Sequence, residues 1–197
     1  MKSVCVFLGS NPGQGNGFVH TAADLGREIA RRGMTLVFGG SNVGCMGVIA
    51  DAAMQAGGHV VGVIPMVLRD KEIAHTGLSE LHVVDGMMER KALMMQLSDG
   101  FVSLPGGLGT MDEFFEALTW TQLGIAARPN GLLNVDGYYD PLLAFLDSAT
   151  QSGFVKPQHR GLVLADTSPG ALLDKMAEWK PVPGGKWTQR PDLDETE

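Results

Sequence analysis

The chain has 197 residues, of which 44% are hydrophobic and 19% are charged, which is enough apolar material for one globular domain with its own core. A formal net charge of −7 argues against a protein that binds nucleic acids or acidic membrane surfaces, because binding to either needs a basic face on the protein. No apolar stretch approaches the roughly 20 residues that span a bilayer, and we expect no signal peptide. Cys5 and Cys45 lack the spacing of metal ligands, so we expect buried free thiols in a soluble, cytoplasmic protein.

Segments of strand and helix character alternate along the chain. The apolar runs expected to form strands are 4–8, 35–38, 59–64, 81–84, 101–104, 132–135 and 163–164. The segments expected to form helices are 18–32, 46–56, 86–97, 110–123, 141–150 and 171–179. Because the strands are continuously apolar, they indicate a parallel sheet covered by helices on both faces, which is an α/β fold. We expect a single domain over residues 1–180, an irregular loop at 66–80 that is mobile or covers a ligand, and a loose C-terminal tail over 181–197.

The most informative stretch joins the expected strand 101–104 to the helix after it. Its glycines let the backbone approach a ligand closely because they carry no Cβ. A strand, a glycine-rich loop and a helix N-terminus in this order form an anion site, since the free N–H groups of the first turn point at the loop. The residues expected to hold a phosphate here are Gly106, Gly107, Leu108, Gly109 and Thr110. The alternative is that Thr110 and Glu113 are only a capping box that starts the helix.

Two further glycine-rich turns, 9–17 and 39–47, follow expected strands. Ligands of parallel α/β sheets bind at the carboxyl ends of the strands, so Gly9, Ser10, Gly39 and Gly40 are expected to contact a nucleotide. The alternative is that these are ordinary tight turns. The glycine spacing does not match the dinucleotide fingerprint, and a Walker P-loop is absent. The sequence therefore favours a mononucleotide over the ligand of a dehydrogenase or an ATPase.

The expected helix 86–97 carries two cations near its start, Arg90 and Lys91, on an otherwise mostly apolar segment. Such a helix is buried on more than one side, in a core or at a subunit contact. Beside a phosphate loop, an arginine offers fixed bidentate donors to phosphate or ribose. The alternative is that both cations extend to solvent or pair with Glu89 or Asp85.

Taken together, these motifs resemble one family in their order along the chain. It is the LOG ("lonely guy") family, the cytokinin riboside 5'-monophosphate phosphoribohydrolases, whose members have often been mislabelled as lysine decarboxylases. The resemblance runs from about residue 4 to residue 179. The matching residues are Gly9-Ser10, Gly39-Gly40, Gly44-Cys45-Met46-Gly47, Gly62-Val63-Ile64-Pro65, Glu89-Arg90-Lys91 and Pro105-Gly106-Gly107-Leu108-Gly109-Thr110-Met111-Asp112-Glu113.

The resemblance implies a Rossmann-like, doubly wound parallel sheet and a homodimer with its active site near the dimer contact. It also implies hydrolysis of a nucleoside 5'-monophosphate to a free base and ribose 5-phosphate. The sequence shows no cluster of metal ligands and no lysine-centred pyridoxal site, so we expect no metal and no cofactor. Arg90 and Glu113 match the family's catalytic pair. Two departures concern the base: Met88 stands where the family commonly shows His, and the segment 13–18 replaces a tyrosine-bearing turn.

The residue types suit this reaction. Cleavage of an N-glycosidic bond builds positive charge on the ribose, and Glu113 is expected to stabilise that charge or to orient the attacking water. Arg90 is expected to hold the substrate, with Met87, Lys91 and Glu116 as further contacts. The alternative for the methionines of this helix is core or dimer packing, which is the commoner use of such residues. A second hypothesis keeps the fold without the reaction: a carrier that binds a nucleotide or a phosphorylated cofactor and does not cleave it.

Overall fold

The computed structural model describes residues 1–69, 71 and 74–181. The expected tail 181–197 lies outside these residues except for Pro181. The elements in chain order are β1 (Ser3–Phe7), α1 (Gly17–Arg31), β2 (Thr35–Phe38), α2 (Gly44–Gln55), β3 (Val60–Pro65), α3 (Met66–Arg69), β4 (Glu80–Val84), α4 (Met87–Gln96), β5 (Phe101–Ser103), α5 (Leu108–Leu123), β6 (Asn130–Leu133), the 3-10 turn η1 (Val135–Gly137), α6 (Asp140–Gln151), α7 (Pro157–Arg160), β7 (Val163–Asp166) and α8 (Pro169–Glu178).

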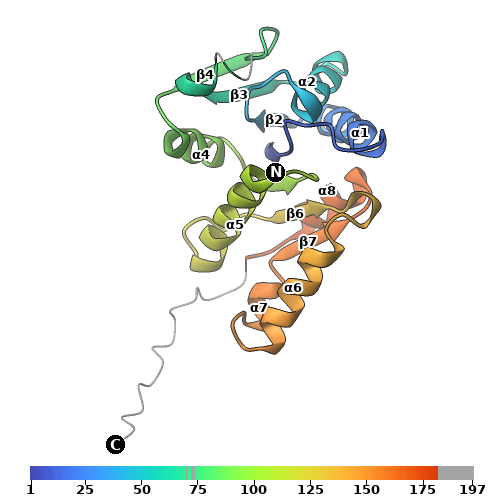
Figure 1. The fold of residues 1–197 in the computed structure, drawn as a ribbon, viewed down its shortest axis with the longest axis vertical. Helices are drawn as coiled ribbons and strands as arrows, with labels where there is room; N and C mark the ends of the chain where they lie inside the picture. The colour runs from blue at the N-terminus through green and yellow to red at the C-terminus, as the bar shows by residue number, and fades with distance from the viewer. Residues whose placement is uncertain (70, 72–73, 182–197) are drawn as a thin grey trace, which may run out of the picture.

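The seven strands form one sheet in the order β4-β3-β2-β1-β5-β6-β7 (Figure 1). Every pair of neighbours is parallel, as the continuously apolar strands predict. The chain builds the sheet outward from β1 to β4, and then α4 carries it back to place β5 on the other side of β1. The strand order therefore reverses between β1 and β5, where the loops after the two strands diverge and leave a crevice.

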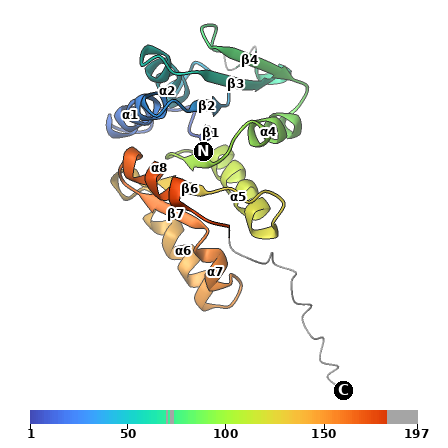
Figure 2. The ribbon, with the colours of Figure 1, turned by 180° about the vertical axis from the view of Figure 1, so that it is seen from behind.

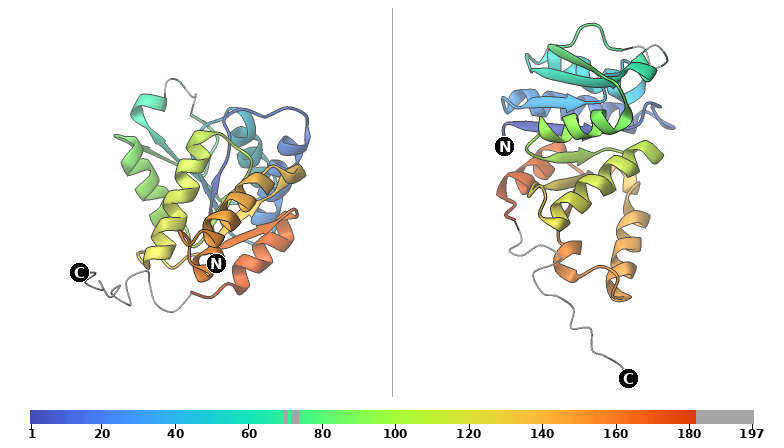
Figure 3. Two further views of the ribbon diagram at one scale, coloured as in Figure 1. Left: turned by 60° about the horizontal axis from the view of Figure 1, so that its bottom comes forward. Right: turned by 90° about the vertical axis from the view of Figure 1, so that its left-hand side faces the viewer.

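Helices cover both faces of the sheet, because successive side chains of a strand point to opposite faces. On one face, Val4 and Val6 of β1 pack in a core cluster with α1, α2 and α8. On the other face, Cys5 and Phe7 pack against α4 and α5, and α6 joins α5 over β6 and β7 in a third cluster. Figure 2 and Figure 3 show these layers from three further directions.

Helix α1 illustrates how the sequence sets an element. Ala22, Leu25 and Ile29 recur at helical spacing and are fully buried, so this stripe fixes the face that packs on the sheet. Gly33 follows the C-cap with φ of +66°, a left-handed conformation that ends helices and suits glycine. The expected helix 18–32 is confirmed to within one residue at each end.

The segment 66–80 differs in part from the expected irregular loop. It contains the short helix α3, and Ala74 forms an isolated antiparallel bridge with Ser41. None of the helices among the described residues is long and apolar enough to cross a membrane.

Candidate active site

A cavity of about 480 Å³ opens at the crevice between β1 and β5, within the size range of small-molecule sites. Its walls come from the loops after these two strands, from the starts of α1, α2, α4 and α5, and from the turn between η1 and α6. The lining residues are Leu8, Gly9, Ser10, Asn11, Pro12, Gly13, Phe18, Met46, Met87, Arg90, Pro105, Gly106, Gly107, Leu108, Gly109, Thr110, Asp112, Glu113 and Tyr138. The first and third glycine-rich turns of the sequence thus meet here.

The glycine loop after β5 forms one wall of the cavity. Helix α5 begins at Leu108, with Gly107 as its N-cap in extended conformation. Thr110 is therefore the third residue of the helix and not its N-cap, so the capping-box alternative for Thr110 and Glu113 is wrong. The helix starts earlier because glycine at the N-cap costs only a few tenths of a kcal/mol relative to a capping side chain. The N–H groups of the first turn are left to a ligand, as an anion site requires.

Position 106 requires a glycine because neighbouring atoms lie too close for a Cβ, and not because of its dihedral angles. A Cβ at this position would lie 2.1 Å from Thr110 Oγ1 and 3.0 Å from the Gly9 nitrogen. The loops after β1 and β5 therefore touch at this point. A Cβ on Gly107 or Gly109, by contrast, would meet no atom within 4 Å, so these two glycines face open space.

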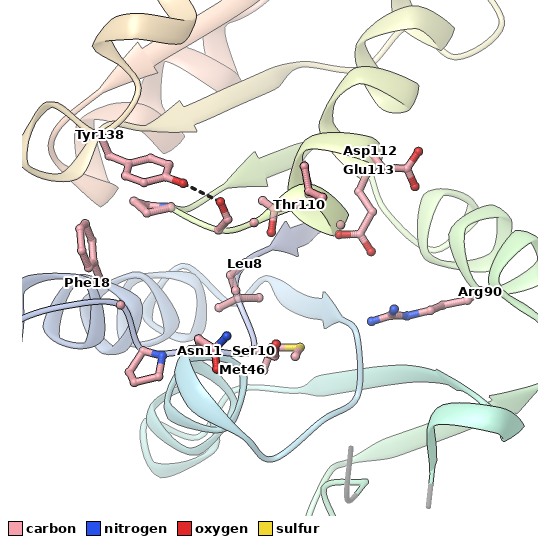
Figure 4. Close-up of a pocket in the computed structure, with 18 of the residues that line it drawn as sticks. Leu8, Ser10, Asn11, Phe18, Met46, Arg90, Thr110, Asp112, Glu113 and Tyr138 are labelled. Carbon is pink, nitrogen blue, oxygen red and sulfur yellow. Dashed lines mark hydrogen bonds between the residues drawn. The ribbon is translucent and has the colours of Figure 1, made fainter. Parts of the chain in front are cut away.

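Arg90 lies at the opposite end of the cavity from the aromatic residues Phe18 and Tyr138 (Figure 4). Its side chain is only 7% exposed. Nε donates a hydrogen bond to the Val63 carbonyl at 3.2 Å, and Nη2 donates to the Gly39 carbonyl at 3.3 Å. A carbonyl within β3 and the carbonyl just after β2 thus hold the guanidinium. The alternative of an arginine that extends to solvent or pairs with an acid near its own helix start is therefore wrong.

Glu113 reaches the same end of the cavity from the second turn of α5 (Figure 4). It is 8% exposed, so a carboxylate and a guanidinium are both buried against one cavity. Cys5 lies behind them in β1; burial raises the pKa of its thiol, and the charge of Glu113 raises it further. The candidate catalytic pair is therefore brought together from α4 and α5.

Lys91 and Glu116 do not line the cavity. Lys91 Nζ lies 2.9 Å from Asp112 Oδ2 and 2.6 Å from Glu116 Oε2. The hydrogen bond that Lys91 donates to Glu116, aided by the one to Asp112, raises the pKa of the lysine. This ion-paired cluster joins α4 to α5, and of its three members only Asp112 also lines the cavity. The alternative that Lys91 pairs with Glu89 or Asp85 is therefore wrong, since its partners are on α5.

The second glycine-rich turn supports the site from behind. Gly39 and Gly40 do not line the cavity; Gly39 leaves room for Arg90, because a Cβ there would lie 2.0 Å from Nη2. Gly44 has φ of +58°, and a Cβ on it would lie 1.9 Å from the Ser10 carbonyl oxygen. The turn therefore packs against the β1–α1 loop, and from this turn only Met46 reaches the described cavity wall.

The aromatic end of the cavity was not predicted as a site. Phe18 and Tyr138 pack edge to face with ring centroids 6.0 Å apart, and both line the cavity. Phe18 belongs to the segment 13–18 that departs from the family pattern, and this departure could have indicated that Phe18 is a site residue. For Tyr138 the sequence holds no such signal, because nothing in it links this residue to a loop 32 residues away. Met87 lines the cavity as expected, while Met88 is 80% exposed and does not.

Comparisons with known proteins show which family this chain resembles. The model of a family described as "Possible lysine decarboxylase" matches residues 46–176. The chain is 48% identical, over 92% of its length and 80% of the relative, to the probable cytokinin riboside 5'-monophosphate phosphoribohydrolase LOGL9 of Oryza sativa subsp. japonica. It is 46% identical to the cytokinin riboside 5'-monophosphate phosphoribohydrolase LOG5 of Arabidopsis thaliana, over 93% of this chain and 81% of that protein.

Solved structures with the same fold include a molybdenum cofactor binding protein from Rippkaea orientalis. It has a TM-score of 0.66 and 24% identity, and the match covers 90% of this chain and 96% of that one. The molybdenum cofactor carrier protein of Chlamydomonas reinhardtii also has a TM-score of 0.66, at 23% identity over 87% of this chain and 94% of that one. At this identity the likeness shows the fold alone.

Proposed function

This chain belongs to the LOG family of phosphoribohydrolases, and from that premise we propose that it hydrolyses a nucleoside 5'-monophosphate. The N-glycosidic bond breaks, water adds its hydroxyl to the anomeric carbon and its proton to the base, and the products are the free base and ribose 5-phosphate. The base is proposed to be a cytokinin, the substrate class in the relatives' names, or plain adenine.

The observation that carries the proposal is the burial of Arg90 and Glu113 against one end of a cavity whose wall includes the glycine loop. The 5'-phosphate is proposed to bind the N–H groups of Gly107, Leu108, Gly109 and Thr110, where the helix dipole favours an anion. Gly9 and Ser10 contribute the facing loop. The ribose then lies toward α4 and α5, within reach of the charged pair.

Glu113 is proposed to act on the reacting carbon. An oxocarbenium-like transition state carries positive charge on the ribose ring, and a buried carboxylate stabilises that charge more strongly than one in water. The same carboxylate can accept a proton from the attacking water. A position in the second turn of α5 keeps Glu113 clear of the first-turn N–H groups, so that the phosphate and the carboxylate do not compete.

Arg90 is proposed to hold the substrate against Glu113. Two backbone carbonyls fix the guanidinium, and this leaves donors on Nη1 for ribose or phosphate oxygens. Nη1 lies 3.9 Å from Met87 Sδ, which is a weak acceptor that a substrate oxygen would readily replace. Met87 itself is proposed as an apolar contact of the bound nucleotide.

The cluster of Lys91, Asp112 and Glu116 is proposed to support catalysis by holding α4 and α5 together, and Asp112 of this cluster also lines the cavity. Adjacent residues of a helix point in directions about 100° apart, so Arg90 and Lys91 serve different faces of α4. Because Lys91 binds two carboxylates of α5, it holds together the two helices that carry Arg90 and Glu113. This replaces direct contact of Lys91 and Glu116 with the substrate, and Gly39 and Gly40 likewise act through the residues they accommodate.

We also propose a homodimer that uses the outer face of α4 and α5. Met88 and Phe115 are exposed there, beside a hollow of about 450 Å³ lined in part by Met111 and Trp120, and exposed apolar groups that gather in this way suit a subunit contact. Light scattering on the purified protein tests this, with a monomer contradicting it. The two free cysteines fit a reducing compartment, and we propose the cytoplasm.

The carrier hypothesis is less supported, because relatives at 42–48% identity are named as hydrolases and the carriers resemble this chain in fold alone. The test is incubation of the protein with AMP and with isopentenyl-AMP, followed by chromatography of the base and an assay for ribose 5-phosphate. Equal amounts of base and ribose 5-phosphate are expected. Binding of either nucleotide without any base release would instead favour the carrier.

A further inference from the structure

Two consecutive tyrosines just before α6 bind the glycine loop. The Tyr138 hydroxyl donates a hydrogen bond to the Gly106 carbonyl at 2.6 Å (Figure 4). The Tyr139 hydroxyl donates to the Leu104 carbonyl at 2.5 Å. The two carbonyls flank Pro105, so the tyrosines fix the backbone on both sides of the point where β5 turns into the loop.

The turn that carries these tyrosines is itself held in place. Asp136 has φ of +51°, the left-handed region, and is alone in this among the non-glycine residues that the structure describes. Such a conformation persists only where its surroundings enforce it. The Asp136 carboxylate abuts the first residue of α1, where a Cβ on Gly17 would lie 2.8 Å from Oδ2, and a negative charge is favourable at a helix N-terminus.

Asn134 completes this support. Its side-chain oxygen accepts the backbone N–H of Tyr139 at 2.7 Å, and its amide nitrogen donates to Asp140 Oδ1 at 2.7 Å. The Tyr138 ring then packs edge to face on Phe18 and on Tyr139, with centroids 6.0 Å and 5.1 Å away. Tyr138 is 45% exposed, but these ring contacts fix its side chain, and its hydroxyl is therefore held beside the Gly106 carbonyl.

The hydrogen bond matters because of the peptide group to which it binds. A peptide is planar and trans, so the carbonyl of Gly106 and the N–H of Gly107 point in opposite directions. Glycines on both sides make this peptide easy to rotate. A rotated peptide would offer a carbonyl oxygen, with its partial negative charge, where the anion site needs an N–H donor. With its carbonyl bound to Tyr138, the peptide keeps its Gly107 N–H on the side away from the tyrosine.

We propose that Tyr138 is a positioning residue for the anion site, whose hydroxyl keeps the Gly106–Gly107 peptide in the orientation that binds phosphate. The inference deepens the proposed function and rests on it for the identity of the anion as the phosphate of a nucleotide. Tyr139 differs in role. It is 1% exposed, and burial raises the pKa of its hydroxyl, which stays protonated as a donor to Leu104 within the core.

The test compares Tyr138→Phe with Tyr139→Phe, since each variant removes one hydroxyl and keeps the ring. The readouts are kcat and KM for AMP, the Kd of ribose 5-phosphate by calorimetry, and urea unfolding. Tyr138→Phe is expected to raise both KM and Kd about tenfold, which corresponds to about 1.4 kcal/mol, with kcat within twofold and an unchanged unfolding midpoint. Tyr139→Phe is expected to lower the midpoint, because it leaves a buried carbonyl without its partner, and to keep KM within twofold.

Unchanged KM and Kd in Tyr138→Phe would overturn the inference, and so would equal increases in both variants, which would indicate general loosening of the loop. Wild-type protein that binds ribose 5-phosphate but releases no base from AMP would refute the proposed hydrolysis, while the Kd comparison would still decide the role of Tyr138. Wild-type protein that does not bind ribose 5-phosphate would overturn the anion site and the inference with it.

Discussion

Substitution of Gly39 by alanine tests whether the position of Arg90 sets the rate. The added Cβ would lie 2.0 Å from Arg90 Nη2 and 3.2 Å from Cζ, whereas carbon and nitrogen atoms without a bond between them stay more than 3 Å apart. The guanidinium must therefore move by more than 1 Å, toward the cavity. It then loses its hydrogen bonds to the Gly39 and Val63 carbonyls.

The expected effects on stability and on activity differ in size. The moving atoms are the end of a flexible side chain beside an open cavity, so water replaces part of the lost hydrogen bonding and the free energy of unfolding falls by about 1–2 kcal/mol. Displacement of a catalytic group by about 1 Å costs on the order of a hundredfold in rate. We therefore expect kcat for base release from AMP to fall about a hundredfold while the protein stays folded.

A double-mutant cycle tests whether the displacement of Arg90 causes the loss of kcat in Gly39→Ala. In an Arg90→Ala background the obstructed side chain is gone, so Gly39→Ala should have no further effect on kcat, and the two substitutions should be strongly non-additive. Gly161→Ala is the matched control, because a Cβ there meets its nearest atom at an ordinary 3.4 Å. A Gly39→Ala enzyme with kcat within threefold of wild type would refute the argument that the Gly39 and Val63 carbonyls position Arg90 for catalysis.

Three further substitutions test other parts of the structure. Gly109→Ala adds a Cβ that meets no atom within 4 Å, so stability should not fall, but KM should rise about tenfold because the space that the phosphate needs is filled. Lys91→Met should lower kcat about fivefold with little change in KM, since its ion pairs with Asp112 and Glu116 hold the helices and not the substrate; stopped assays give both constants. Glu28→Gln should lower the free energy of unfolding by about 1 kcal/mol at pH 7, after allowance for solvent screening, and urea unfolding at several pH values measures it.

The pH dependence of that last effect has a definite sign. Hydrogen bonds from Arg31 and Arg32 lower the pKa of Glu28 from 4.5 to about 2, so the folded state holds this proton more weakly than the unfolded state. The stabilisation is complete above pH 4.5 and is lost as the pH falls toward 2. The difference between Glu28→Gln and wild type should therefore shrink by more than half between pH 7 and pH 3, and a constant difference would contradict the ion-pair origin.

The predictions for Gly109→Ala and Lys91→Met would each be contradicted by a different result. Unchanged KM in Gly109→Ala would place the phosphate elsewhere. Weaker binding of ribose 5-phosphate by Lys91→Met, without a matching effect of Glu116→Gln, would show that the lysine contacts the substrate directly.

Much of the fold follows from local patterns. Continuous apolar strands separated by amphipathic helices define a covered parallel sheet, and the elements lie within a few residues of the predicted bounds because the glycines and prolines that end them act locally. The reversal of strand order between β1 and β5 puts the first and third glycine-rich turns together. The predicted contacts Gly9, Ser10, Met87 and Arg90 thus meet in the cavity.

The parts that were missed depend on contacts between distant segments. The capping-box alternative failed because Gly107 could serve as the N-cap, and a local motif does not show which of two starts the chain adopts. Lys91 follows Arg90 directly, and helical geometry alone places them on different faces, but the partners of Lys91 are on another helix. The bond between Tyr138 and Gly106 joins two connections that are separate in sequence, and no local pattern predicts it.

The central claim is that Glu113 acts on the glycosidic bond of a nucleotide held by the glycine loop. The most direct measurement compares wild type with Glu113→Gln in base release from AMP and in calorimetric binding of ribose 5-phosphate. Glutamine keeps the shape of the side chain, and α5 starts at Gly107 and does not depend on residue 113. We predict that turnover falls at least about a hundredfold while the Kd of ribose 5-phosphate stays within threefold. A folded Glu113→Gln protein that releases base at the wild-type rate would contradict the account.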